Sequence, residues 1–344
     1  MAKVKEEKKG VDAILEQLEK KYGLQRSKLG DYKVVSTGSI QLNQAMGING
    51  TAVGKIVEIF GPESSGKSTI TLHQISEYQK AIPERKVALF DYEHSFDKKY
   101  ATSLGVDVAN LLIYQPDTQE SGYDMIIELI KNKIVSCVVI DSQTAASPKA
   151  IIDGEMGDAT IGLQARNNSK FCLKVKGLLD IHNVTLFFIS QTRDSIGGMG
   201  EPTITTGGKA IKFYADVRWK VWKQNDKPNE LNKTTIDVIK NKLGNPFGQA
   251  KIDILWGVGF DRLGEIIDYA CEFNLIKKGG PWYTISDDIK LQGANAVKTF
   301  LQDNPEFLKE LTNKVMNKIN NVETSSEEEI IEQIKIDFDV TSEI

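Results

Sequence analysis

The residues with the clearest chemical meaning form one glycine-framed loop. Residues 61–68 spell Gly-Pro-Glu-Ser-Ser-Gly-Lys-Ser and match the pattern G-x-x-x-x-G-K-[ST], which binds nucleotide phosphates. Glycines let such a loop curl so that backbone N–H groups point at phosphate oxygens, and the following helix adds positive potential from its N-terminus. The loop therefore predicts a site for ATP. The residues expected to contact it are Gly61, Pro62, Glu63, Ser64, Ser65, Gly66, Lys67, Ser68 and Thr69.

Two side chains of this loop should differ in their roles. Lys67 is expected to reach the β- and γ-phosphates, and the Ser68 hydroxyl is expected to bind Mg²⁺. A second metal ligand should follow a neighbouring buried strand, and Asp141 does so, directly after the run Cys-Val-Val-Ile. The alternative interpretation is an aspartate that only caps the next turn. Given the phosphate loop upstream, we expect Ser68 and Asp141 to hold the magnesium ion.

Hydrolysis of the triphosphate also requires a group that orients and deprotonates water. The strand-like run 86–91 is followed by Tyr92 and Glu93, which places Glu93 at the carboxyl edge of a parallel sheet, where ligands bind. We predict that Glu93 activates the water. Asp91 is the open alternative, because the sequence alone does not decide which carboxylate faces the γ-phosphate.

The elements that must position these groups follow from hydrophobic periodicity. Short β-rich runs alternate with longer helical segments after residue 35. Strands are expected at 55–60, 86–91, 111–115, 136–140 and 185–190, and helices near 67–80, 121–132 and 163–181. This alternation predicts the α/β class, with a mixed, mostly parallel central sheet covered by helices.

The pattern changes after residue 215. The next strands are expected near 216–223, 234–240 and 249–256. Joined by polar turns, they fit a meander that extends the sheet antiparallel. Beyond residue 263 the pattern becomes helical, with a turn and strand at GGPWY (279–283) and a last helix beginning at Pro305 after a capping Asn304. These elements predict a small α+β C-terminal domain.

The two ends of the chain differ from the core. At 11–22, apolar residues recur at helical spacing, but a single helix ahead of a loop cannot bury its own stripe and must pack on something else. We predict an N-terminal segment at 1–34, a core at 35–263, the C-terminal domain at 264–320 and an acidic, disordered tail at 321–344.

Composition and charge set limits on the class of protein. The 344 residues are 40% hydrophobic and 26% charged, typical of a soluble globular protein. There is no apolar run of about 18 residues and no signal peptide, and the three scattered cysteines fit reduced thiols, so we expect a cytoplasmic protein with no membrane partner. The net charge of −4 is uneven, because residues 321–344 hold eight acids and one base, leaving 42 Lys+Arg against 39 Asp+Glu in the body. Charge therefore does not exclude nucleic acid.

Many further segments, in chain order, resemble the bacterial RecA recombinase family. The similar strings are STGSIQLNQAMG (36–47), IVEIFGPESSGKSTITL (56–72), DYEHSFD (91–97), NLLIYQPDTQE (110–120), VVIDS (138–142), DGEMGD (153–158), LQAR (163–166), FISQTR (188–193), TTGGKAIKFYADVR (205–218), KNKLGNPF (240–247) and GGPWY (279–283). No single string would establish this, but the ordered set across 11–320 is highly specific. The resemblance implies a P-loop RecA-like core in a DNA-dependent ATPase that forms filaments on single-stranded DNA and pairs it with a homologous duplex.

The resemblance also implies roles for single residues. Tyr100 would stack on adenine, with Asp97 contacting it, and Gln191 would sense the γ-phosphate. Lys240 and Lys242 would reach the ATP of the adjacent protomer and join Lys67, Glu93 and Gln191 in the catalytic set. Phe213 would belong to the polymer contact, and the helix at 11–22 would be a polymerisation helix that docks on the neighbour.

Two loops would hold DNA in this family. The first spans roughly 153–162 and precedes Arg166; the second runs over 192–208 and is rich in Gly, Ser and Thr, as a long functional loop can be. The expected DNA contacts are Ile161, Arg166, Arg193, Met199, Gly207 and Gly208.

The chain departs from the family pattern mainly near these loops. Asn167 and Asn168 replace the apolar pair usual after the arginine, and Leu173 stands where a basic residue is common. The second loop is slightly shorter and lacks an aromatic residue near Met199. These departures fit a divergent or phage-encoded member.

Alternative functions stay open from the sequence. The filament could serve as a DNA-damage scaffold without strand exchange, stimulating self-cleavage of a LexA-like repressor in an SOS-type response, and loader or mediator proteins are possible partners. A hexameric helicase would need a primase-binding or zinc module, and a small-molecule kinase would need an arginine-rich lid; the sequence suggests neither.

Overall fold

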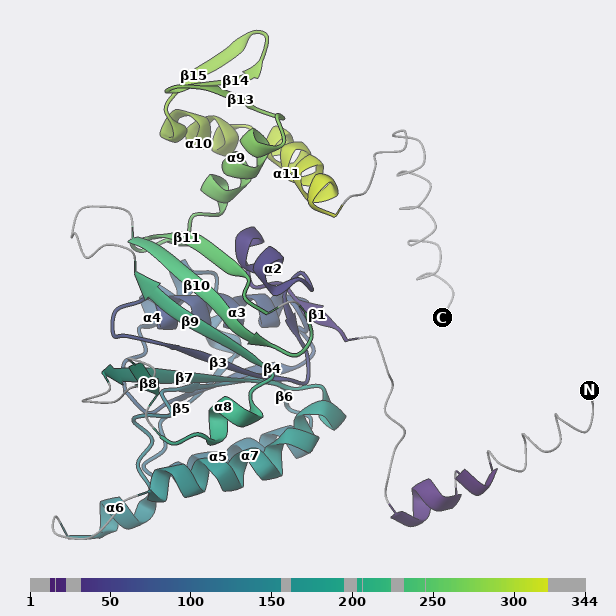
Figure 1. Ribbon diagram of the computed structural model, residues 1–344, viewed down its shortest axis with the longest axis vertical. Helices are drawn as coiled ribbons and strands as arrows, with labels where there is room; N and C mark the ends of the chain where they lie inside the picture. Colours follow the sequence, from purple (N-terminus) through teal and green to yellow (C-terminus); the bar gives the residue numbers. More distant parts are fainter. Residues whose placement is uncertain are drawn as a thin grey trace, which may run out of the picture. The chain divides into compact units, whose positions relative to one another are not determined.

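The computed structural model of the protein describes residues 13–15, 17–22, 32–155, 162–194, 203–205, 207–223, 232–244 and 246–320 (Figure 1). The chain divides into two units, Met1–Lys33 and Val34–Ile344. In the first unit, residues 13–15 and 17–22 are helical, and the side chains of Ile14, Leu18 and Tyr22 are exposed. The helix expected at 11–22 is therefore present over its described part.

A mixed sheet, ten-stranded in the described part of the chain, forms the centre of the second unit. Its order is β12-β11-β10-β9-β3-β7-β6-β4-β5, with β8 paired to β7 outside this order. The pairings from β9 to β5 are parallel and those from β9 to β12 antiparallel. The strands are β3 (Ile56–Gly61), β4 (Lys86–Asp91), β5 (Leu111–Tyr114), β6 (Val135–Asp141), β7 (Thr185–Asp194), β8 (Thr203–Thr205), β9 (Val217–Lys223), β10 (Asn232–Asn241), β11 (Gln249–Leu255) and β12 (Gly259–Phe260).

The predicted α/β fold with a mostly parallel sheet is confirmed, with one correction. The predicted meander extends the sheet by antiparallel pairs from β9 to β11, but β9 itself joins the core parallel to β3. After β8 the chain passes through the short helix α8 (Ala210–Tyr214) before β9 begins, so that it enters the sheet in the direction of the core strands. The direction reverses only at β10.

Helices cover both faces of the sheet (Figure 1). One face carries α2 (Ile40–Met46), α3 (Lys67–Ala81) and α4 (Lys98–Ser103), and the other carries α5 (Gln119–Lys131), α7 (Leu163–His182) and α8. The buried strand β6 serves both cores, because Cys137 and Val139 pack on one side and Val138 and Ile140 on the other. A strand buried on both faces has an unbroken apolar run, which is why the sequence predicted it well.

The C-terminal part is a small α+β unit with its own apolar core. It consists of α9 (Arg262–Glu272), β13 (Lys277–Gly279), β14 (Trp282–Ser286), β15 (Ile289–Gln292), α10 (Ala294–Asp303) and α11 (Pro305–Ile319). Glu265 of α9 accepts hydrogen bonds from Ser39 Oγ (2.6 Å) and Ile40 N (2.7 Å) at the start of α2. Pro305 opens α11 as predicted, but the Asn304 side chain does not cap it; its Nδ2 donates to Phe300 O of the preceding helix.

Smaller elements complete the description. They are β1 (Val34–Val35) and β2 (Thr51–Ala52), which pair with each other, the 3₁₀ turn η1 (Val108–Asn110) and α6 (Lys149–Asp153). The three cysteines are free, as the sequence suggested. Among the described helices, none combines the length and the apolar character needed to cross a membrane.

Candidate active site

The phosphate loop joins the buried strand β3 to the N-terminus of α3. Gly66 is the N-cap of α3 and has φ +98°, a conformation that favours glycine. A Cβ at Gly66 would also stand 2.9 Å from Ile254 Cδ1 of β11, so the meander packs directly against the loop. The first backbone N–H groups of α3 have no partner within the helix and can serve phosphate oxygens.

Lys67 lies in the mouth of this loop. Its Nζ donates to the carbonyl oxygens of Gly61 (3.0 Å) and Pro62 (2.6 Å). These carbonyls accept the hydrogen bonds that the ammonium group would otherwise donate to phosphate oxygens. Burial lowers the pKa of Lys67, and the carboxylates of Asp141 and Glu93 oppose that shift. The side chain is thus held within the phosphate loop and near the carboxylates of Asp141 and Glu93.

The oxygen donors expected for magnesium lie next to each other. Ser68 Oγ donates to Asp141 Oδ2 at 3.5 Å. Burial, together with the nearby carboxylates of Glu93 and Asp91, raises the pKa of Asp141 to about 7, so a cation here would relieve an unfavourable cluster of negative charge. The described residues contain no group of three or more His, Cys, Asp or Glu side chains placed to hold a metal ion, but Mg²⁺ bound with a nucleotide needs only one or two protein oxygens. The donor set therefore fits the ion.

Glu93 and Asp91 differ sharply in their surroundings. Glu93 Oε1 accepts from Ser142 Oγ (2.5 Å) and Gln191 Nε2 (2.8 Å) and lies at the open edge of the sheet. Asp91 is 1% exposed, and its oxygens accept from two backbone N–H groups of the following turn and from Gln115 Nε2. Because Asp91 is committed to this turn, the geometry favours Glu93 as the group that faces a water molecule.

The residues expected around the adenine ring, Asp97 and Tyr100, are hydrogen-bonded to neighbouring residues. The hydroxyls of Tyr100 and Thr69 are hydrogen-bonded at 2.7 Å, which ties Tyr100 to the end of the phosphate loop. Asp97 is the N-cap of α4 and accepts from the backbone N–H groups of Lys99 (2.8 Å) and Tyr100 (3.1 Å). The adenine contacts assigned to Asp97 and Tyr100 stay predictions.

Lys240, Lys242 and Phe213 cluster around α8 instead of the phosphate loop. Lys240 Nζ donates to the carbonyls of Lys212 (2.8 Å) and Phe213 (3.0 Å), and Lys242 Nζ lies 3.6 Å from Asp216 Oδ1. Within the described residues, neither lysine hydrogen-bonds to the loop at 61–68. The Phe213 side chain is 69% exposed, so it is available to another molecule.

The predicted DNA contacts are only partly described. Arg166 is exposed in the first turn of α7, and Gly207 and Gly208 both have positive φ. The side chain of Arg193 and the whole of Ile161 and Met199 lie outside the described residues. The sequence predicted a loop over 192–208, but the ends of this range pair as an antiparallel ladder, with Thr192 opposite Thr205.

The sequence did not reveal the contacts of two polar residues near the site. Ser142 follows Asp141 and holds Glu93, while Thr144 Oγ1 accepts the backbone N–H of Gln191 (3.2 Å). Both stand within three residues of the predicted metal ligand, and that proximity was the available signal. Glu93 follows β4 and Gln191 lies on β7, and only the folded sheet brings these partners beside Ser142 and Thr144.

The phosphate loop, the strand-edge carboxylates and the mixed sheet together define a P-loop ATPase with a RecA-like core. A family model described as the RecA N-terminal domain matches residues 9–261, and one described as the RecA C-terminal domain matches 264–320. The chain therefore belongs to the bacterial RecA family, which makes it a recombinase and an ATPase-type enzyme whose family binds DNA and uses ATP and magnesium.

Individual relatives are similar to this chain over nearly its full length. A protein RecA of Bacteroides thetaiotaomicron is 44% identical over 326 residues, covering 92% of this chain and 98% of the relative. A protein RecA of Staphylococcus carnosus is 41% identical over 326 residues, covering 91% of each chain. One from Campylobacter jejuni is 42% identical over 323 residues, covering 90% of this chain and 93% of the relative.

Proposed function

We propose that the protein polymerises on single-stranded DNA, hydrolyses ATP in a DNA-stimulated reaction and exchanges strands with a homologous duplex. The observation that carries this proposal is the hydrogen bond between Gln191 and Glu93. Gln191 stands on β7, and the same strand runs on into the second DNA loop. A change at the γ-phosphate would therefore act directly on the segment expected to hold DNA.

The hydrolytic step follows from the positions of the side chains. Lys67 and the N-terminus of α3 bind the phosphates, and Ser68 and Asp141 would hold magnesium, which neutralises phosphate charge when bound. Glu93, held by Ser142 and Gln191, orients a water molecule and takes its proton during attack. Loss of the γ-phosphate would leave Gln191 hydrogen-bonded to Glu93.

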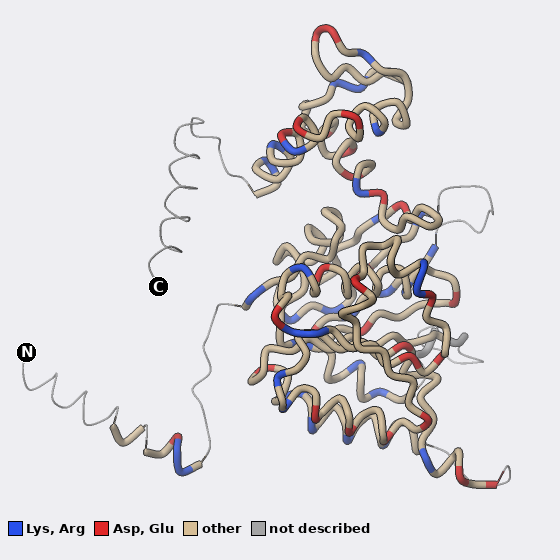
Figure 2. Tube along the Cα trace, turned by 180° about the vertical axis from the view of Figure 1, so that it is seen from behind, with Lys and Arg blue, Asp and Glu red and all other residues tan. Residues whose placement is uncertain are grey.

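DNA would be held without reading its sequence. Backbone N–H groups at Gly207 and Gly208, with Arg166 and Arg193, suit contacts to phosphates. Ile161 and Met199 are proposed to wedge between bases. Figure 2 shows Lys and Arg interspersed with Asp and Glu along the described part of the chain trace. Local contacts of the loops, and not the overall charge, are therefore the proposed basis of DNA binding.

The polymer contact would place nucleotide between protomers. Lys240 and Lys242 of one protomer are proposed to reach the ATP of the next, while Phe213 and the helix at 11–22 pack on the neighbour. The carbonyls that hold Lys240 belong to α8, the helix that carries Phe213. Binding of ATP would in this way be linked to the polymer contact. The same filament is proposed to stimulate self-cleavage of a LexA-like repressor.

Strand exchange is tested directly by D-loop formation. Purified protein is mixed with ATP, Mg²⁺, a single-stranded oligonucleotide and a homologous supercoiled duplex, and joint molecules are separated on a gel. We expect joint molecules with the wild type and none with Lys67→Ala, which lacks the phosphate-binding ammonium group. Filaments that form on DNA without producing joint molecules would leave only the scaffold function.

A further inference from the structure

Asn168, on α7, is the centre of a buried hydrogen-bond network. Its side chain is 0% exposed. Its Oδ1 accepts from Gln119 Nε2 (2.8 Å) and from the Tyr123 hydroxyl (2.6 Å), both on α5. Its Nδ2 donates to Gln143 Oε1 (2.9 Å) and to the backbone carbonyl of Gly207 (2.8 Å). These four bonds use the full hydrogen-bonding capacity of an amide side chain, so the orientation of Asn168 is fixed.

The same network reaches the nucleotide site. Gln143 Nε2 donates to Thr144 Oγ1 (3.4 Å), which also accepts the backbone N–H of Gln191 (3.2 Å). The Gln191 side chain in turn donates to Glu93 Oε1 (2.8 Å). A continuous series of hydrogen bonds thus runs from the proposed water-activating carboxylate to Gly207, at the far end of the second DNA loop.

Gly207 is fitted closely to this network. Its φ is +89°, and a Cβ built on it would stand 2.4 Å from Gln143 Oε1. Only glycine therefore lets the backbone approach near enough for its carbonyl to bond Asn168. Gln164, also on α7, donates to the carbonyls of Gln143 (2.9 Å) and Thr144 (3.1 Å) and fixes the segment after β6 on this helix.

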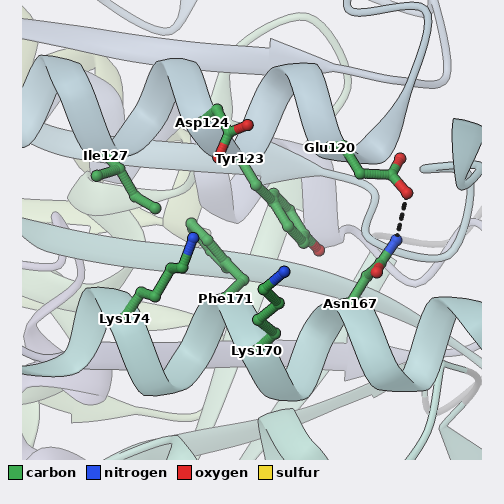
Figure 3. A pocket seen from close by; sticks show the side chains of 8 residues that line it. All are labelled: Glu120, Tyr123, Asp124, Ile127, Asn167, Lys170, Phe171 and Lys174. Carbon is green, nitrogen blue, oxygen red and sulfur yellow. Dashed lines mark hydrogen bonds between the residues drawn. The ribbon is translucent and has the colours of Figure 1, made fainter.

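The neighbouring Asn167 has a different position. Figure 3 shows it reaching across the groove between α5 and α7, where its Nδ2 donates to Glu120 at 2.8 Å. In the same groove, Tyr123 stacks on Phe171 with ring centroids 3.9 Å apart and supports the network from α5. Asn167 is only partly buried and bonds neither Gln143 nor Gly207 among the described contacts. It is therefore a matched control on the same helix.

We propose that Asn168 is a positioning residue that transmits the state of the nucleotide site to the second DNA loop. When a γ-phosphate draws Gln191 away from Glu93, the backbone of β7 and Thr144 shift together, and Gln143 and Asn168 carry the shift to Gly207. The inference rests on the proposed function in one respect: DNA is taken as the ligand of that loop. Because Gly207 ends the loop, its position sets where the preceding residues meet DNA.

The test compares Asn168→Asp with the wild type and with Asn167→Asp. Aspartate keeps the size and the acceptor oxygen Oδ1 of Asn168 but loses both N–H donors, so the bonds to Gln143 and Gly207 break. Hydrogen exchange of a peptide that includes 203–208 is measured without DNA, in ADP and in a non-hydrolysable ATP analogue. ATP hydrolysis is then measured with and without poly(dT), and melting temperature is recorded for each protein.

We expect the wild type and Asn167→Asp to exchange more slowly in the ATP analogue than in ADP. Asn168→Asp should bind both nucleotides but lose this difference, and its stimulation by poly(dT) should fall about tenfold, within the usual range of coupling between sites. A variant that melts lower yet keeps both the exchange difference and the stimulation would show that Asn168 is structural, and the proposal would be wrong.

A second variant provides the test if Asn168→Asp does not fold. Thr144→Val removes the hydroxyl that links Gln191 to Gln143, at a partly buried position, and should give the same loss of coupling; retained coupling would overturn the proposal. An exchange difference that the wild type shows and Asn168→Asp loses, without any DNA stimulation, would support this inference and contradict the proposed function, so the two can fail separately.

Discussion

At the scale of single residues, Glu93 is constrained from two sides. Ser142 and Gln191 both donate to its Oε1, which leaves the other carboxylate oxygen free of these two bonds. A general base must lie within hydrogen-bond reach of the proton it abstracts, and a fixed orientation favours this. Asp91 lacks that freedom, since three donors already occupy its oxygens.

Replacing Glu93 by glutamine should separate binding from turnover. Glu93→Gln keeps an acceptor for Ser142 and Gln191 but cannot take a proton, so turnover should fall about 10²- to 10⁴-fold while ATP still binds. Steady-state hydrolysis and titration with a fluorescent ATP analogue measure the two effects. Asp91→Asn is the control and should mainly lower the melting temperature. Normal turnover in Glu93→Gln would remove Glu93 from its proposed role.

At the scale of elements, α3 joins the nucleotide site to the meander. His73, in the middle of α3, stacks on Phe260 of β12 with ring centroids 3.9 Å apart, and its Nε2 accepts the Phe260 backbone N–H at 3.0 Å. Burial lowers the pKa of His73 to about 3; Arg262 and Lys80 add to the shift and Glu77 opposes it. The imidazole is therefore neutral in the folded protein, and its Nε2 stays an acceptor.

This histidine predicts a pH dependence of stability. Below the unfolded pKa of 6.5 the unfolded chain gains a proton that the folded chain takes up only near pH 3, so the stability due to His73 is present above pH 6.5 and is lost as pH falls. Between pH 7 and 5 the loss should be about 2 kcal/mol. Urea unfolding across this range should show a flatter dependence for His73→Gln, which keeps an acceptor. Equal slopes for the two proteins would contradict the assignment.

The elements also show how far the sequence could predict the structure. The sequence predicted the phosphate loop and the buried strand before Asp141, because each pattern is formed by residues that follow one another in the chain. The direction of β9 could not be predicted from the sequence, because it depends on where the chain re-enters the sheet after α8. The Asn304 side chain bonds backward to Phe300, an outcome that cap preferences do not distinguish.

The Asn168 network could not be predicted from sequence patterns for a related reason. Its members lie on α5, after β6, on α7 and beyond β8, four segments that only tertiary folding brings together. The sequence marked Asn168 merely as a polar residue where the family usually has an apolar one. Four partners at a fully buried site explain how the amide is accommodated, because buried polar groups are stable when they are hydrogen-bonded.

At the scale of the whole molecule, Phe213 should govern self-association. Burying an exposed phenylalanine contributes about 1.5–3 kcal/mol, so Phe213→Ala should weaken assembly in the ATP analogue about 10- to 100-fold and leave nucleotide binding intact. Sedimentation velocity over a concentration series measures this change. Ile181→Ala, on α7, is a control of similar exposure, 65% against 69%. Equal assembly of Phe213→Ala and wild type would place the polymer contact elsewhere.

The acidic C-terminal residues should affect DNA binding through charge. Deleting 321–344 removes eight acids and one base and leaves a body with 42 Lys+Arg against 39 Asp+Glu. If these acids compete with phosphates, the truncated protein should bind duplex DNA more tightly at low salt, with the gain shrinking as salt rises. Filter binding over a salt series measures the slope. An unchanged affinity at every salt concentration would rule out charge competition.

The most direct test of the central claim is ATP hydrolysis with and without single-stranded DNA at fixed salt, with electron microscopy of the same samples. A DNA-stimulated filament ATPase should hydrolyse ATP slowly alone and much faster with DNA, and open helical filaments should form on the DNA. Equal hydrolysis with and without DNA, by particles that never polymerise, would contradict the proposed function and leave only a P-loop ATPase.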